Sequence, residues 1–80
     1  MNKYPYTYNE FETEVKKQYL KDYCNNNKKY MEEIFELEDL DKVIQNNYNS
    51  CKVEYEKGER PLQENLKQEV RSVVACLGMF

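Results

Sequence analysis

The chain has 80 residues, of which 40% are hydrophobic and 34% charged, and it contains two glycines and two prolines. Such a composition excludes a low-complexity or flexible chain and indicates one small globular domain with a thin hydrophobic core. The formal net charge of -3 disfavours tight binding to a nucleic-acid backbone, because that binding needs clustered lysine and arginine.

The sequence shows neither a secretory signal nor an apolar run near the ~20 residues that span a bilayer. We therefore expect a single helical domain over residues 1–80 that resides in the cytoplasm and does not contact membranes. Its three cysteines, Cys24, Cys51 and Cys76, form no C-x-x-C pair, and no histidine accompanies them. They are expected to be reduced thiols, buried as small apolar residues at helix positions, without a metal site or a disulfide framework.

The N-terminal segment carries tyrosines at positions 4, 6 and 8, with Pro5 between the first two. Pro5 holds Tyr4 in an extended conformation, which predicts a non-helical strap across the rest of the domain. Tyrosine is common both in cores and in interfaces. The sequence therefore leaves open whether Tyr4 and Tyr6 pack on their own domain or on a partner.

From Tyr8 onward, apolar residues recur at steps of three or four, which predicts a helix over residues 8–23. Thr7 or Asn9 can cap its start. The stripe expected to be buried consists of Tyr8, Phe11, Val15, Tyr19 and Tyr23. Three consecutive asparagines follow, and their side chains compete with helical hydrogen bonds, so a turn is predicted near residues 24–27.

The stretch from residue 28 to residue 56 reads as one long helix until the phases of its apolar residues are compared. Met31, Ile34 and Phe35 lie on one side of such a helix. The later apolar residues form a stripe roughly opposite: Leu40, Val43, Ile44, Tyr48, Cys51 and Tyr55. We therefore predict two helices, over residues 28–37 and 40–56, with Asp39 as the N-cap of the second. One uninterrupted helix with two apolar sides is the alternative.

Gly58 suits the left-handed end of the third helix, and Pro61 suits the first turn of a fourth helix over residues 61–77. The apolar face of this fourth helix consists of Leu62, Leu66, Val70, Val73, Val74 and Leu77, and Gly78 ends it. Short connections favour antiparallel neighbours, so the fold class is all-α: a small three- to four-helix bundle with an extended N-terminal strap. A two-stranded sheet of residues 4–8 and 51–56 is the alternative, but such a sheet is marginal in water.

Most catalytic templates are missing from this sequence. Without histidine there is no catalytic triad and no side chain whose ordinary pKa lies near neutral pH. The isolated glycines form no phosphate-binding loop, and a small bundle offers little depth to shift the pKa of a carboxyl group. The sequence therefore predicts a protein that is not an enzyme and holds no cofactor.

The segment "EEIFELEDLD" contains six acidic residues, and no basic residue lies between Lys29 and Lys42. The six are Glu32, Glu33, Glu36, Glu38, Asp39 and Asp41. They form either a solvated helix face or a surface that meets a basic groove on a protein that normally binds nucleic acid. With Tyr4, Tyr6 and Phe80, which are aromatic residues near the two ends, they are the candidate partner-binding residues.

A lysine-rich stretch, "KKQYLKDYCNNNKK", interleaves basic residues with Tyr19 and Tyr23 and superficially resembles a platform for single-stranded nucleic acid. Both tyrosines belong to the predicted buried stripe. We therefore expect these lysines to pair with the acidic segment, within the molecule or in a dimer, and do not expect direct nucleic-acid binding.

The leading hypothesis is a non-enzymatic protein that binds and occludes another macromolecule. Short, acidic and rich in tyrosine and asparagine, the chain is similar in character to small phage and mobile-element proteins, including anti-CRISPR inhibitors. That similarity covers no defined motif and implies a host defence or regulatory protein as the partner. One alternative is a self-associating structural or regulatory module that shares the apolar faces of the third and fourth helices between subunits. Another is a small nucleic-acid-binding regulator.

Overall fold

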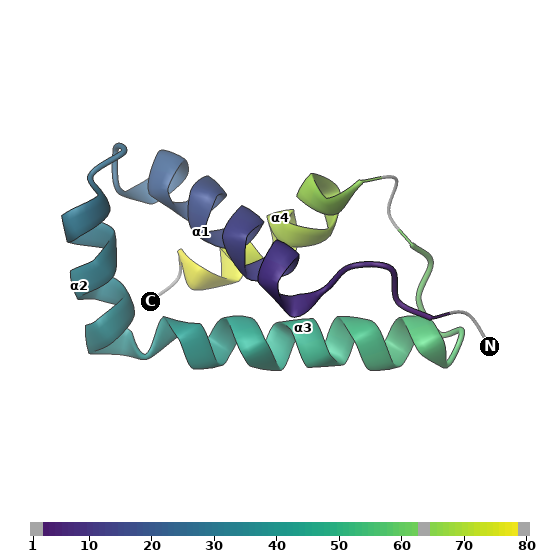
Figure 1. Cartoon of the computed structure of the whole chain (residues 1–80). Coiled ribbons are helices and arrows are strands. Elements are labelled where there is room, and N and C mark those ends of the chain that lie inside the picture. The colour runs from purple at the N-terminus through teal and green to yellow at the C-terminus, as the bar shows by residue number, and fades with distance from the viewer. Residues whose placement is uncertain (1–2, 63–64, 79–80) are drawn as a thin grey trace.

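A computed structural model describes residues 3–62 and 65–78, and these form a bundle of four helices (Figure 1). The helices are α1 (Tyr8–Tyr23), α2 (Lys28–Glu38), α3 (Leu40–Glu56) and α4 (Leu66–Leu77). The prediction of an all-α bundle with an extended N-terminal strap is confirmed, and the first three helices lie within one residue of their predicted bounds. The described ranges contain no strand, so the alternative of a small sheet is wrong.

The longest helix, α3, runs along the molecule, which measures 41 × 21 × 20 Å. Helices α1 and α4 pack on each other and on α3, whereas α2 crosses one end of α3 (Figure 1). Among the described residues, α2 contacts α1 and α3 but not α4. No helix in this part of the chain is both long enough and apolar enough to cross a bilayer.

Polar side chains set the first two helix starts. Thr7 caps α1 with a capping box: its Oγ1 accepts the Glu10 N–H at 3.2 Å, and Glu10 Oε1 accepts the Thr7 N–H at 3.3 Å. The predicted turn is also present, because Asn25 and Asn26 take left-handed φ angles of 49° and 62°, which asparagine tolerates better than most residues. Asn27 then caps α2.

The break between α2 and α3 is confirmed, and Asp39 occupies the predicted N-cap position of α3, but not with the geometry of a side-chain cap. Asp39 has φ 51° and ψ 47°, and its side chain makes no cap hydrogen bond to α3. An N-cap side chain bonds the next turn from an extended backbone, and Asp39 is left-handed instead. Its own N–H donates to the Phe35 carbonyl, so Asp39 closes the C-terminus of α2.

The start of the fourth helix is also corrected. Gly58 ends α3 with a φ of 79°, as predicted, but α4 begins at Leu66 rather than at Pro61. Asn65 is the reason, because its side chain accepts the Gln68 N–H at 3.0 Å and supplies an N-cap that Pro61 lacks. Leu62 therefore lies outside the helix and is 39% exposed.

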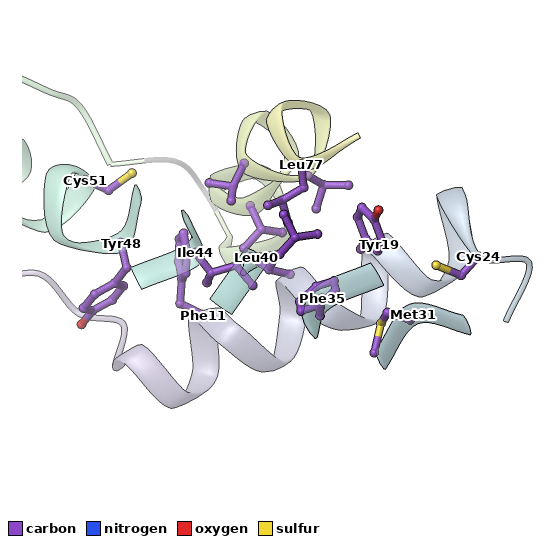
Figure 2. Close-up of a cluster of buried hydrophobic side chains, with 14 of the residues drawn as sticks. Phe11, Tyr19, Cys24, Met31, Phe35, Leu40, Ile44, Tyr48, Cys51 and Leu77 are labelled. Atoms are coloured by element: carbon purple, nitrogen blue, oxygen red, sulfur yellow. The ribbon is translucent and has the colours of Figure 1, made fainter. Parts of the chain in front are cut away.

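The core fills the space between α1, α3 and α4 (Figure 2). Its centre consists of residues without solvent exposure: Phe11, Val15, Leu40, Ile44 and Leu77. Met31 and Phe35 of α2 close one end. Two expectations of burial are wrong: Tyr23, in the last turn of α1, is 45% exposed, and Cys76 is exposed whereas Cys24 and Cys51 are buried.

Candidate protein-binding surface

All six acidic residues singled out in the sequence are exposed, and we refer to them as the acidic surface. Four of them, Glu32, Glu33, Glu36 and Glu38, lie on α2. Asp39 lies at the junction and Asp41 in the first turn of α3. Because α2 stands at one end of the molecule, the structure gathers these carboxylates there (Figure 1).

Lys16 of α1 neutralises part of the acidic surface. Its Nζ lies 3.0 Å from Asp41 Oδ1 and 3.6 Å from Glu12 Oε1, and 5.7 Å from the centre of the Phe35 ring. Partial burial by itself lowers the pKa of Lys16, but its hydrogen bond with Asp41 and the two acidic charges outweigh burial and raise that pKa. One lysine of the basic stretch thus pairs with the acidic segment within the molecule, as expected.

The remaining acids of the surface are not neutralised in this way. Within the described residues, no ion pair joins a basic side chain to Glu32, Glu33, Glu36, Glu38 or Asp39. Lys16 and Asp41, with Met31 and Phe35, line a hollow of about 330 Å³ against this surface. Glu32, Glu36 and Asp39 also line it, so its carboxylates outnumber its one lysine and the hollow is suited to cationic groups.

Leu37 is a candidate contact residue that the sequence pattern did not single out. Its side chain is 83% exposed between acidic neighbours on α2. With Glu33 and Glu36 it lines a second hollow. Its spacing in the sequence could have identified it. A second apolar stripe on one side of α2 consists of Tyr30, Ile34 and Leu37, which follow one another at steps of four and three.

Tyr4 and Tyr6 pack on their own domain, which answers the question that the sequence left open. The Tyr4 side chain is 5% exposed, and its ring meets the rings of Tyr6, Tyr48 and Tyr55 edge to face. The carbonyl of Tyr6 accepts the Tyr48 hydroxyl at 2.6 Å. Tyr4 is therefore covered and does not belong to the exposed candidate surface, whereas Tyr6 is half-buried. Phe80 lies outside the described residues.

A buried polar cluster fastens the strap. Glu69 of α4 is 1% exposed, and its Oε2 accepts the Tyr4 hydroxyl at 3.0 Å and Arg60 Nη2 at 3.3 Å. Arg60 Nη1 also lies 3.2 Å from Cys51 Sγ, and the Tyr4 N–H donates to Glu56 at 3.1 Å. Sequence reasoning did not single out Glu69, although this residue lies three positions after Leu66 and four before Val73, at the edge of the apolar face.

This cluster joins the strap to α3, to α4 and to the connection between them. Burial, followed by the charge of Glu69, raises the pKa of Tyr4 above its usual range, so its hydroxyl is held as a hydrogen-bond donor. Burial also raises the pKa of the Cys51 thiol, with a smaller opposing effect from Arg60. Among the described side chains, no three His, Cys, Asp or Glu residues gather in a metal-binding arrangement.

Comparison of the chain with protein families, curated proteins and solved structures returned no match.

Proposed function

We propose that this protein is a non-enzymatic, stoichiometric binder that occludes another macromolecule through its acidic surface. The observation that supports this proposal is the concentration of exposed carboxylates on one helix and its junction. Asp41 is paired with Lys16, whereas the other five have no ion pair among the described residues. A surface of one charge attracts a partner of the opposite charge and raises the rate of association.

The partner we propose is a host defence or regulatory protein with a basic groove that normally binds nucleic acid. Carboxylates spread over α2 and the start of α3 would occupy that groove in place of phosphates. The character of the chain, which is similar to small phage and mobile-element inhibitors, agrees with this choice. Since the attraction is between exposed charges, the affinity should fall as salt is added.

The structure favours neither of the two alternatives. Sharing the apolar faces of α3 and α4 between subunits would require those faces to be free, but Leu40, Ile44, Val73 and Val74 are buried within one chain. Stacking of nucleic-acid bases on both Tyr19 and Tyr23 would require two exposed rings, whereas Tyr23 is 45% exposed and Tyr19 only 3%. Light scattering tests the first alternative, since a stable dimer at micromolar concentration would support it.

The test of the proposed function compares two charge-reversed variants. The first carries Glu32→Lys, Glu33→Lys and Glu36→Lys, and the control carries Asp22→Lys, Glu54→Lys and Glu59→Lys, which change the net charge equally at exposed positions elsewhere. The partner is captured from the native host with the wild-type chain and identified by mass spectrometry. Its affinity for each variant is then measured at low and high salt.

We expect the first variant to bind the captured partner at least about tenfold more weakly than the wild type at low salt, and the control to bind almost as the wild type does. The wild-type chain should also displace nucleic acid from the partner at one-to-one stoichiometry. Equal affinities of the two variants at low salt would contradict the proposal.

A further inference from the structure

Helix α2 presents a second apolar stripe that its own domain leaves partly uncovered. Met31 and Phe35 point into the core and are buried (Figure 2). Tyr30 and Leu37 are 48% and 83% exposed, and with the half-buried Ile34 they lie on another side of the same helix. A short helix that buries one apolar stripe and exposes another is typical of a helix that serves both a core and an interface.

This exposed stripe is one wall of a groove of about 300 Å³. The opposite wall consists of Tyr19 and Tyr23 of α1, whose ring centres are 5.1 Å apart, and Gly78 at the end of α4. Gly78 lies directly against the Tyr23 ring, since a Cβ at this position would overlap the ring unless Tyr23 moved. The groove exists because α2 does not contact α4 within the described residues.

The rim of the groove is acidic. Glu38 lines the groove itself, and Glu33 and Glu36 line the neighbouring hollow on the outer side of Leu37. No described lysine or arginine lines either of the two. The complementary ligand therefore has an apolar centre with basic groups beside it.

The backbone of that ligand is also constrained. An extended peptide gains affinity by adding a strand to a sheet edge, and the described residues contain no strand to receive one. A ligand that satisfies its own backbone hydrogen bonds suits this site better, and an α-helix does so.

We propose that the groove receives apolar side chains from a basic amphipathic helix of the partner. This inference rests on the proposed function and adds to it the kind of segment that is recognised. The apolar face of the helix lies between Tyr23, Tyr30 and Leu37, and its lysines or arginines meet the carboxylates of the rim. The apolar contact gives the complex a component of affinity that persists when salt weakens the charged contacts.

Two synthetic peptides of about 18 residues, or five helical turns, test this inference. One carries leucines along one helical face and lysines elsewhere. The other has the same lysines but glutamines in place of the leucines. Each is titrated into the protein at low and high salt and followed by NMR of the tyrosine and methyl resonances. We expect the leucine peptide to bind at least about tenfold more tightly, with the largest shifts at Tyr23, Tyr30 and Leu37.

Leu37→Ala is the decisive variant, and Val53→Ala is its control, because Val53 is 47% exposed on α3 and does not line the groove. Leu37→Ala should weaken binding of the leucine peptide about tenfold and leave binding of the glutamine peptide unchanged. Val53→Ala should change neither. These exposed positions contribute little to the core, so both variants are expected to fold.

The outcomes separate this inference from the proposed function. Equal affinity of the protein for the two peptides would contradict the proposed apolar contact in the groove, but it would not contradict the proposed role of the acidic surface. Failure of both peptides to bind at low salt would count against both proposals. The last comparison uses a variant truncated after Gly78. If the leucine peptide binds this variant but not the 80-residue chain, residues 79 and 80 of the same chain are the occupant of the groove, and the inference is wrong.

Discussion

The carboxylate of Glu69 stays in the core because donors from two distant parts of the chain reach it. Tyr4 comes from the N-terminal strap and Arg60 from the connection before α4, and both bond the same oxygen. A buried charge is costly unless it is paired and hydrogen-bonded, so each donor also compensates for the burial of the acid. The strap is held by this polar contact as well as by its aromatic rings.

Tyr4→Phe should therefore lower the free energy of unfolding by about 2 kcal/mol, since it keeps the ring but removes a donor to a buried charged group. Urea denaturation followed by circular dichroism measures this change. Tyr30→Phe is the matched control, because the Tyr30 side chain is 48% exposed, and it should change stability by less than about 0.5 kcal/mol. The double variant with Glu69→Gln should be less destabilised than the sum of its single variants. Additive effects would show that the two residues are not coupled.

At the scale of single elements, the junction between α2 and α3 depends on one left-handed residue. Asp39 has positive φ, which glycine adopts without strain and alanine does not. Aspartate lies between these two, since its short polar side chain tolerates this region better than most. The corner that turns α2 across the end of α3 is therefore stable but carries backbone strain.

Asp39→Gly should raise the free energy of unfolding by about 0.5 to 1 kcal/mol, and Asp39→Ala should lower it by about 1 kcal/mol. Both variants remove the same carboxylate, so a difference between them reports backbone conformation and not charge. Thermal and urea denaturation give the two values. If both variants shifted stability equally, the left-handed conformation would not be the cause.

The elements themselves could be predicted to different degrees. Apolar spacing was sufficient for α1, α2 and α3, because each has a buried stripe at helical steps. The start of α4 was not predicted, because Pro61 and Asn65 are both good start signals and only the second begins the helix. Periodicity also cannot tell which side of a short helix such as α2 its neighbours will cover, so the exposure of Leu37 was missed.

Of the candidate site, the sequence predicted the acidic surface but not the buried cluster around Glu69. The acidic surface could be read directly, because six acids on a short polar segment have few ways to become buried. The burial of Glu69 depends on partners that lie 65 and nine positions away along the chain, and a local pattern contains no information about them. The same holds for Tyr4, whose place in the core depends on how α3 and α4 pack.

For the molecule as a whole, the tyrosines make stability sensitive to alkali. The pKa is raised above the ordinary 10.0 for Tyr4, Tyr6, Tyr8, Tyr19 and Tyr48, with burial as the largest cause in each case. For Tyr8, burial and then the Glu12 carboxylate raise the pKa to about 12. The folded state thus holds these protons more tightly than the unfolded state. Their contribution to stability is full below the ordinary tyrosine pKa of 10.0 and is lost as the pH rises through the raised values, which for Tyr8 means through about 12.

We therefore expect the helical signal to disappear cooperatively above pH 10, together with a step in phenolate absorbance. Circular dichroism and ultraviolet absorbance recorded along the same titration check this. Tyr8→Phe removes one of the shifted groups and should make the transition less steep. Ionisation of all eight tyrosines near pH 10.0 with the helices intact would contradict the expectation.

The bond between Tyr4 and Glu69 also bears on when this protein can fold during its synthesis. It joins residues 65 positions apart, so the strap leaves the ribosome early and its acceptor leaves late. Until α4 has emerged, α1 and α3 lack the helix that completes their shared core, and closing so long a loop is slow. Folding of this bundle is thus expected to wait until α4 has been translated.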